Sequence, residues 1–185
     1  MSKKPVMPVM LDLETLAIHP LAAVIDIAIG KIDDGILADR WLITPESYTD
    51  SFCFHVDQET IAFHNKQNTG LMKQAAVTGQ PWQQVAEYVF NYLQNIAQGA
   101  ELHIWCQGKD FDIPILANLL TQAGYKLPWK YSHTHCLRDL AKLYPEIKRT
   151  SWGNHTASLD VFHQVKHLMA LASYDDRVYR MVFGE

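Results

Sequence analysis

Three apolar, β-branched runs near the start of the chain constrain its fold most strongly. They cover residues 6–12, 21–32 and 36–43, and Asp34-Gly35 lies between the second and the third. Short apolar runs bounded by turn residues are typical of buried strands, and an Asp-Gly pair between two such runs is a strong β-hairpin signal. The first quarter of the chain therefore predicts three sequential strands that pair as a meander.

Helical patterns dominate the remainder of the chain. Helices are expected from Asp57, over 82–96, 111–123 and 137–144, and from just after His155 to about Ala172. Short strands are expected over 102–106 and near 130–132. This order predicts an α/β fold with a mixed sheet. Because no linker or repeat divides the 185 residues, we expect one domain over 1–185.

Composition is that of a folded intracellular protein. Apolar residues make up 48% and charged residues 19% of the chain, which argues against disorder. Its apolar runs are too short for a signal peptide or a membrane span, and three irregularly spaced cysteines are typical of reduced thiols. We therefore expect a cytoplasmic protein with no membrane partner. The net charge of −4 gives no support for nucleic-acid binding.

Paired carboxylates end the first predicted strand, in the segment Asp12-Leu13-Glu14-Thr15. Side chains two residues apart on a strand point to the same face, so Asp12 and Glu14 can converge on one site. Neighbouring carboxylates repel unless a proton or a cation lies between them, and oxygen ligands suit Mg²⁺ or Mn²⁺. Taken alone, this short segment also fits an exposed strand end with a turn at Thr15.

Two further motifs carry carboxylates. Asp112 follows the strand over 102–106 and opens a helix, where the helix dipole also favours a carboxylate for structural reasons. His155 and Asp160 lie five residues apart, about 500° along a helix, so they converge only if His155 precedes the helix. Thr156 as the N-cap residue would place it there.

In this order, the motifs Asp12-x-Glu14, Phe111-Asp112 and His155-x₄-Asp160 resemble those of the DEDDh branch of DnaQ-like 3′–5′ exonucleases. The likeness to small phage and bacterial exonuclease VIII-like enzymes covers about residues 7–170. Further matching segments are 12–16, 59–62, 105–112, Pro128-Trp129, 136–138 and Gln164. Departures from the pattern occur at Phe63-His64, Gln107, Leu159 and Val161, and none of them removes a metal ligand or the base.

The resemblance implies a ribonuclease H-like fold, in which a central mixed five-stranded sheet carries helices on both faces. Its first three strands would form an antiparallel meander, followed by parallel strands. The resemblance also implies two Mg²⁺ or Mn²⁺ ions, with Asp12 bridging them, Glu14 and Asp160 completing the first site and Asp112 supporting the second. His155 would be the general base.

The implied substrate is the 3′ end of single-stranded DNA or RNA. Leu13, Thr15 and Phe111 lie beside the metal ligands and are expected to contact it. The resemblance also admits a homodimer, although no heptad pattern supports one. The sequence does not distinguish DNA from RNA as the substrate.

A basic segment lies between the second and third motifs. Residues 126–149 contain six Lys or Arg residues against two acidic ones, and Trp129 and Trp152 lie within or just after the segment. Basic groups interleaved with aromatic rings are typical of single-strand binding surfaces, and also of a solvated helix with core aromatics. Trp129, Arg138 and Trp152 are therefore candidate nucleic-acid contacts.

Three alternatives compete with the exonuclease interpretation. A zinc site from His133, His135, Cys106 and Cys136 lacks the regular ligand spacing of structural zinc sites. A non-catalytic nucleic-acid-binding domain of the same fold would be expected to lose metal ligands, whereas the full set is present here. A ribonuclease H-like endonuclease would keep the same carboxylates, and only the products of cleavage distinguish it.

Overall fold

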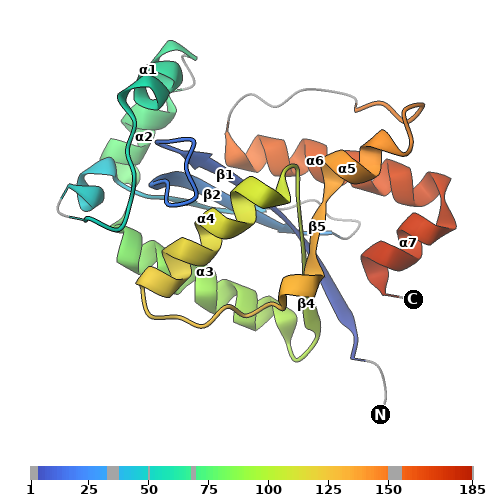
Figure 1. Cartoon of the computed structure of the whole chain (residues 1–185). Helices are drawn as coiled ribbons and strands as arrows, with labels where there is room; N and C mark the ends of the chain where they lie inside the picture. Colours follow the sequence, from blue (N-terminus) through green and yellow to red (C-terminus); the bar gives the residue numbers. More distant parts are fainter. Residues whose placement is uncertain (1–3, 33–37, 50, 68–69, 150–155, 185) are drawn as a thin grey trace.

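In the computed structural model of the chain (Figure 1), the fold is described for residues 4–32, 38–49, 51–67, 70–149 and 156–184. The strands are β1 (Val6–Thr15), β2 (Val24–Lys31), β3 (Ala38–Leu42), β4 (Glu101–Cys106) and β5 (Thr134–Cys136). The α-helices are α1 (Gln58–Lys66), α2 (Leu71–Thr78), α3 (Trp82–Ala97), α4 (Lys109–Gln122), α5 (Leu137–Lys142), α6 (Ala157–Tyr174) and α7 (Asp176–Phe183). Two 3₁₀ helices, η1 (Pro45–Tyr48) and η2 (Tyr131–His133), complete the described elements.

The described strands form one mixed five-stranded sheet in the order β3-β2-β1-β4-β5. β2 pairs with β1 and β3 in antiparallel fashion, whereas β4 pairs with β1 and β5 in parallel. This arrangement confirms the expected meander followed by parallel strands. The turn predicted at Asp34-Gly35 lies outside the described residues, but the antiparallel pairing of Gly30 with Ala38 agrees with it.

Helices cover both faces of the sheet, as expected (Figure 1). Leu11 and Ile104 lie in an apolar cluster with α3 and α4 on one face. Met10 and Trp105, one residue away along the same strands, pack with α6 and α7 on the other face. Successive side chains of a strand point to opposite faces, so β1 and β4 are buried on both sides. No helix in the described part of the chain is long and apolar enough to span a bilayer.

Some elements differ from the sequence-based expectation. The strand expected near 130–132 is η2, and β5 begins only at Thr134, opposite Ile104. Trp129, just before η2, packs in the core, and the β4–β5 ladder begins only with the pair Ile104–Thr134. The helices α2 and α7 were not predicted. Each has eight residues, and α7 buries only Val178 and Val182, so its apolar pattern is too short to identify.

A buried ion pair fixes the start of α6 to the sheet. Asp26 of β2 is fully buried and accepts two hydrogen bonds from the Arg40 guanidinium on β3, at 2.8 and 2.7 Å. The same carboxylate accepts from the Ala157 backbone N–H at 3.2 Å. Thr156 is the N-cap residue, as expected, but its hydroxyl makes no capping hydrogen bond among the described residues. Asp26 therefore caps α6 from a neighbouring strand.

The Arg40→Met variant is expected to lower the free energy of unfolding by about 3–5 kcal/mol, because it leaves the Asp26 carboxylate buried without its partner. Urea unfolding followed by circular dichroism measures this loss. The exposed pair Arg180–Asp176 offers a matched control, since Arg180→Met should cost no more than about 1 kcal/mol. Similar losses in the two variants would contradict the structural role of Asp26.

Candidate active site

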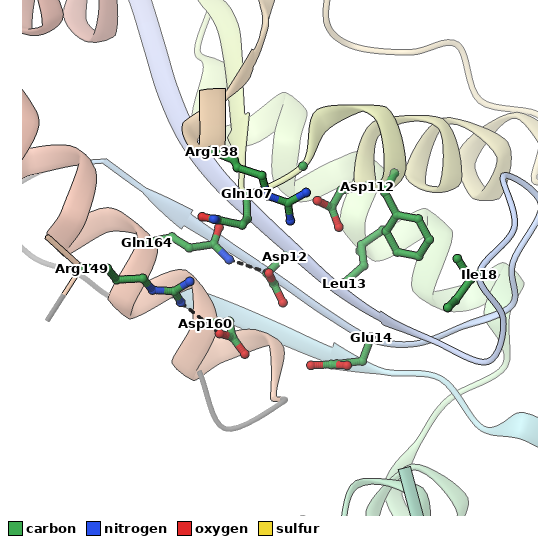
Figure 2. Close-up of a pocket in the computed structure, with 12 residues that line it drawn as sticks. Asp12, Leu13, Glu14, Ile18, Gln107, Asp112, Arg138, Arg149, Asp160 and Gln164 are labelled. Atoms are coloured by element: carbon green, nitrogen blue, oxygen red, sulfur yellow. Dashed lines mark hydrogen bonds and ion pairs between the residues drawn. The ribbon is translucent and has the colours of Figure 1, made fainter. Parts of the chain in front are cut away.

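Three carboxylates meet where β1 ends and α6 begins. Asp12 and Glu14 lie two residues apart on β1, and Asp160 lies in the first turn of α6. One oxygen from each carboxylate lies within 4.8 Å of the others. Figure 2 shows these side chains directed toward a common space between the strand and the helix. The expected convergence of Asp12, Glu14 and Asp160 is therefore present in the fold.

Asp112 reaches the same space from α4. Its helix follows β4 directly, and β4 is the parallel neighbour of β1. All four carboxylates line one cavity of about 820 Å³. The other lining residues are Leu13, Ile18, Gln107, Gly108, Phe111, Arg138, Arg149 and Gln164. Because parallel strands carry their following loops to the same edge of the sheet, residues 100 positions apart share this cavity.

Two long side chains hold the carboxylates in place. Gln164, one helical turn after Asp160, is buried and donates a hydrogen bond from Nε2 to Asp12 Oδ1 at 2.6 Å. Arg149 donates from Nη2 to Asp160 Oδ1 at 3.2 Å (Figure 2). Each contact holds one carboxylate by a hydrogen bond from a side chain that also lines the cavity, so the two carboxylates are held facing the cavity.

Burial and mutual repulsion raise the pKa values of these carboxyl groups. The pKa of Asp12 lies well above its ordinary value because of burial first, and then because of Asp112, Asp160 and Glu14. Burial, with repulsion from Asp160 and Asp26, raises the pKa of Glu14 to about 8.

Asp112 is affected in the same direction. Burial raises its pKa to about 7, although hydrogen bonds from the Gly108 backbone and the Cys106 thiol and the positive charge of Arg138 oppose the shift. The raised pKa values mean that the ionised carboxylates repel one another and are more stable beside a proton or a further cation. A divalent cation supplies such positive charge, and an all-oxygen donor set suits a hard cation. The residues present therefore fit a divalent metal.

The sequence comparison identifies the family. A family model described as the Rv2179c-like 3′–5′ exoribonuclease domain matches residues 7–172. The chain belongs to this exoribonuclease family. No curated protein has a matching sequence.

Several solved nuclease structures are similar to this member of the exoribonuclease family. Escherichia coli Exonuclease I in complex with a 5cy-dA13 oligonucleotide has a TM-score of 0.68 and 14% identity over 94% of this chain. The match covers only 42% of the Exonuclease I chain. Exonuclease X in complex with 5′-overhanging duplex DNA has a TM-score of 0.61 and 18% identity, over 95% of this chain and 98% of that one.

A third similar structure is the nuclease domain of 3′hExo, a DEDDh family member bound to rAMP. Its TM-score is 0.55 and its identity 12%, over 91% of this chain and 92% of that one. At these identities the likeness concerns the fold. It confirms the expected ribonuclease H-like fold of the DEDDh exonucleases, and the family match confirms the resemblance seen in the motifs.

The predicted nucleic-acid contacts that lie among the described residues divide into three groups. Leu13, Phe111 and Arg138 line the 820 Å³ cavity. Thr15 lines an adjoining cavity of about 340 Å³, which Leu13 and Phe111 also line. Trp129 is only 8% exposed and packs in the core cluster, so its ring is not available to stack on a base. This corrects the expectation for Trp129.

Two predicted site residues, His155 and Trp152, lie outside the described residues. Their assignments as general base and as nucleic-acid contact stay predictions.

Sequence reasoning missed several residues that shape this site. Asp26 lies inside the apolar run 21–32, and a lone carboxylate in a buried strand was a signal that a partner must exist. Arg149 was counted only as part of a basic segment, whereas it pairs with Asp160. His64 of α1 is buried, and its Nε2–H donates a hydrogen bond of 2.8 Å to the Thr15 carbonyl oxygen, which anchors the end of β1.

Raised carboxyl pKa values predict how the stability of metal-free protein depends on pH. Glu14 has a pKa of about 8 in the fold and an ordinary value of about 4.3 when unfolded. Because the folded value is the higher one, stability is complete below about pH 4 and declines as the pH rises toward 8. Asp112, with a pKa of about 7, adds to the decline.

Melting curves in chelator at pH 5 and pH 8 measure this dependence. We expect a lower unfolding temperature at pH 8, by several degrees, since 1 kcal/mol corresponds to about 2–4 °C in a chain of this length. Mn²⁺ should restore the loss at pH 8 and have little effect at pH 5. A melting temperature that does not change between the two pH values would contradict the clustering of these carboxyl groups.

Proposed function

We propose that this protein is a metal-dependent 3′–5′ exonuclease that hydrolyses phosphodiester bonds at the 3′ end of single-stranded nucleic acid. The products would be nucleoside 5′-monophosphates. The observation that carries the proposal is the convergence of four carboxylates, from β1, α4 and α6, in one cavity. Membership of a family described as 3′–5′ exoribonucleases supports the same reaction.

The proposed cofactors are two divalent cations, either Mg²⁺ or Mn²⁺. Asp12 would contact both ions, Glu14 and Asp160 would complete one site, and Asp112 would support the other. Bound cations of this kind neutralise charge on phosphoryl oxygens and lower the pKa of a coordinated water. Gln164 keeps the Asp12 carboxylate turned toward the cavity through its 2.6 Å hydrogen bond.

Other side chains are proposed to transfer the proton and to contact the phosphate and the bases. His155 is proposed to accept the proton of the attacking water, because an imidazole titrates near neutral pH. Arg138 and Arg149 line the cavity and place positive charge beside the carboxylates, where a phosphate oxygen can pair with a guanidinium. Trp152 is proposed to contact a base farther along the strand.

The 340 Å³ cavity beside the carboxylates is proposed to hold the terminal nucleoside. Leu13, Phe111 and Phe63 give it apolar walls, and its volume is in the range of small-ligand pockets. Asp57 and Glu59 also line it. Their carboxylates can accept hydrogen bonds from sugar hydroxyl groups, which include the 2′-hydroxyl that distinguishes RNA from DNA. This polar rim and the family description favour RNA as the substrate.

Matched RNA and DNA oligonucleotides of one sequence, labelled at the 5′ end, test the proposal. With Mg²⁺ or Mn²⁺ we expect a ladder of products shortened one nucleotide at a time from the 3′ end, with RNA degraded faster, and no reaction in chelator. Discrete internal cuts would indicate an endonuclease. Binding without cleavage in either metal would indicate a non-catalytic domain and overturn the proposal.

Three further features are proposed rather than observed. Residues 1–185 would act as one catalytic domain, the protein would work in the cytoplasm, and it would do so as a monomer or a homodimer. Size-exclusion chromatography with light scattering measures the oligomeric state, and fractionation of cells measures the location.

A further inference from the structure

A second cluster of metal-ligand side chains lies far from the carboxylates. Among the described residues, Glu101, His103 and His133 each place one ligand atom within 4.8 Å of the other two. Glu101 and His103 lie on β4, and His133 ends η2, directly before β5. Because residues two apart on a strand share a face, Glu101 and His103 point to the same side of the sheet.

We propose that Glu101, His103 and His133 form a Zn²⁺ site that joins the start of β4 to η2 and β5. Two imidazoles and one carboxylate are a donor set typical of zinc, with a water molecule as the fourth ligand. The carboxylate cluster at the other end of β1 offers oxygen atoms alone, which suit Mg²⁺ or Mn²⁺. The two clusters therefore select different cations.

The separations fit a tetrahedral ion. Zinc bonds of about 2.1 Å place two ligand atoms about 3.4 Å apart in tetrahedral geometry. His133 Nε2 lies 3.8 Å from Glu101 Oε2, and all three ligand atoms lie within 4.8 Å of one another. The His103 and His133 rings stack with their centroids 4.3 Å apart, so the rings must turn for both nitrogen lone pairs to point at one ion. The side chains of His133 and Glu101 are 15% and 27% exposed, so an ion can reach them from solvent.

Neighbouring side chains already orient these ligands. His135 Nε2 and His103 Nδ1 share a hydrogen bond of 3.1 Å, and the His135 ring stacks on Trp105. When Nδ1 of His103 is the donor, its Nε2 atom carries the lone pair that a metal requires, and such partners commonly fix the ring of a zinc-bound histidine. Lys130 pairs with Oε1 of Glu101, so Oε2 is the oxygen that faces His133.

The proposed zinc site is separate from the nuclease site. Glu101 pairs with Val6 in the parallel register, six residues before Asp12 on β1. At about 3.3 Å per residue, the two clusters lie about 20 Å apart along the strand. Only three residue pairs join β5 to β4, at the edge of the sheet (Figure 1). A zinc ion held from β4 and η2 would add a link there and stabilise the folded state.

Zinc titration of the full chain, carrying Asp12→Asn and Asp160→Asn to disable the carboxylate cluster, tests the proposal by calorimetry. We expect one Zn²⁺ per chain and a zinc-dependent rise in the unfolding temperature. His133→Ala in this background should weaken binding by at least about 100-fold, because loss of a partner of a ligand alone costs about 10–100-fold. His55→Ala removes a histidine from the exposed His19–His55 pair and should leave binding unchanged.

Lys130→Met provides a second variant, in which zinc binding should be retained. Lys130 is exposed, and its ammonium group pairs with the Glu101 carboxylate that zinc would bind. Without that ammonium group, zinc should bind at least as tightly as before. Nuclease activity in Mg²⁺ should not change in the His133→Ala single variant. No zinc uptake by the background protein, unchanged affinity in its His133→Ala form, or loss of binding with His55→Ala would each overturn the proposal.

Discussion

The Asp12→Asn variant is expected to lose nuclease activity by more than about 10³-fold, because loss of one preorganised group at a transition state already costs about 10²–10³-fold. Asp12 lies at the centre of the cluster, where its pKa is raised by Asp112, Asp160 and Glu14 together. Asparagine keeps the shape of the side chain and an Oδ1 acceptor for Gln164, so the change removes charge with little effect on packing. The rate of degradation of a labelled RNA in Mg²⁺ or Mn²⁺ measures the loss.

The same substitution should make the metal-free protein more stable at pH 8, since it removes one of several buried charges that repel one another. A loss of activity together with a higher unfolding temperature would separate a catalytic role from a structural one. Asp39→Asn, at an exposed position on β3, is the matched control and should change neither quantity. An active Asp12→Asn variant would show that this carboxylate is not part of the catalytic site.

The sheet could be predicted from the sequence because β1, β2 and β4 are largely apolar and buried and the meander is local. Residues 6–12 and 21–32 carry few polar side chains, and short loops leave little choice of partner. The position of β5 could not be predicted in the same way. It has only three residues, and the long-range pairing of Ile104 with Thr134 sets its start rather than any local pattern.

The carboxylates of the site could be predicted because each lies at a strand end or a helix start, where the fold gathers side chains at one edge. The contacts that orient them could not. Gln164 and Asp12 are 152 residues apart, and Asp26 reaches the first N–H of α6 across 131 residues. No periodicity in a single sequence records such pairs.

The charge of the chain illustrates the same limit. A net charge of −4 argues mildly against a polyanionic substrate. In the structure, the acidic residues of the site line one cavity together with Arg138 and Arg149, and their raised pKa values show that this cavity attracts positive charge. Total charge is therefore a poor guide to a chain whose acidic side chains gather in one cavity.

The His155→Ala variant is expected to lose about 10²–10⁴-fold in rate, the usual range for a general base. His155 lies outside the described residues, but Thr156 is the N-cap residue of α6 and Asp160 lies in its first turn. In the sequence, His155 therefore directly precedes the helix that carries Asp160, and Asp160 lines the cavity. Single-turnover rates at saturating Mn²⁺ measure the loss without interference from substrate binding.

The pH dependence of the rate distinguishes a base from a residue that only supports the loop. A histidine that acts as a general base must be unprotonated, so the rate of the unmodified protein should rise as the pH increases and the imidazole loses its proton. The variant should lack this rise, and added imidazole should restore part of its activity, because a free base can occupy the space left by the ring. His55→Ala, at an exposed position remote in sequence, should keep the normal profile. A variant that retains the rise with pH and does not respond to imidazole would assign the proton transfer to another group.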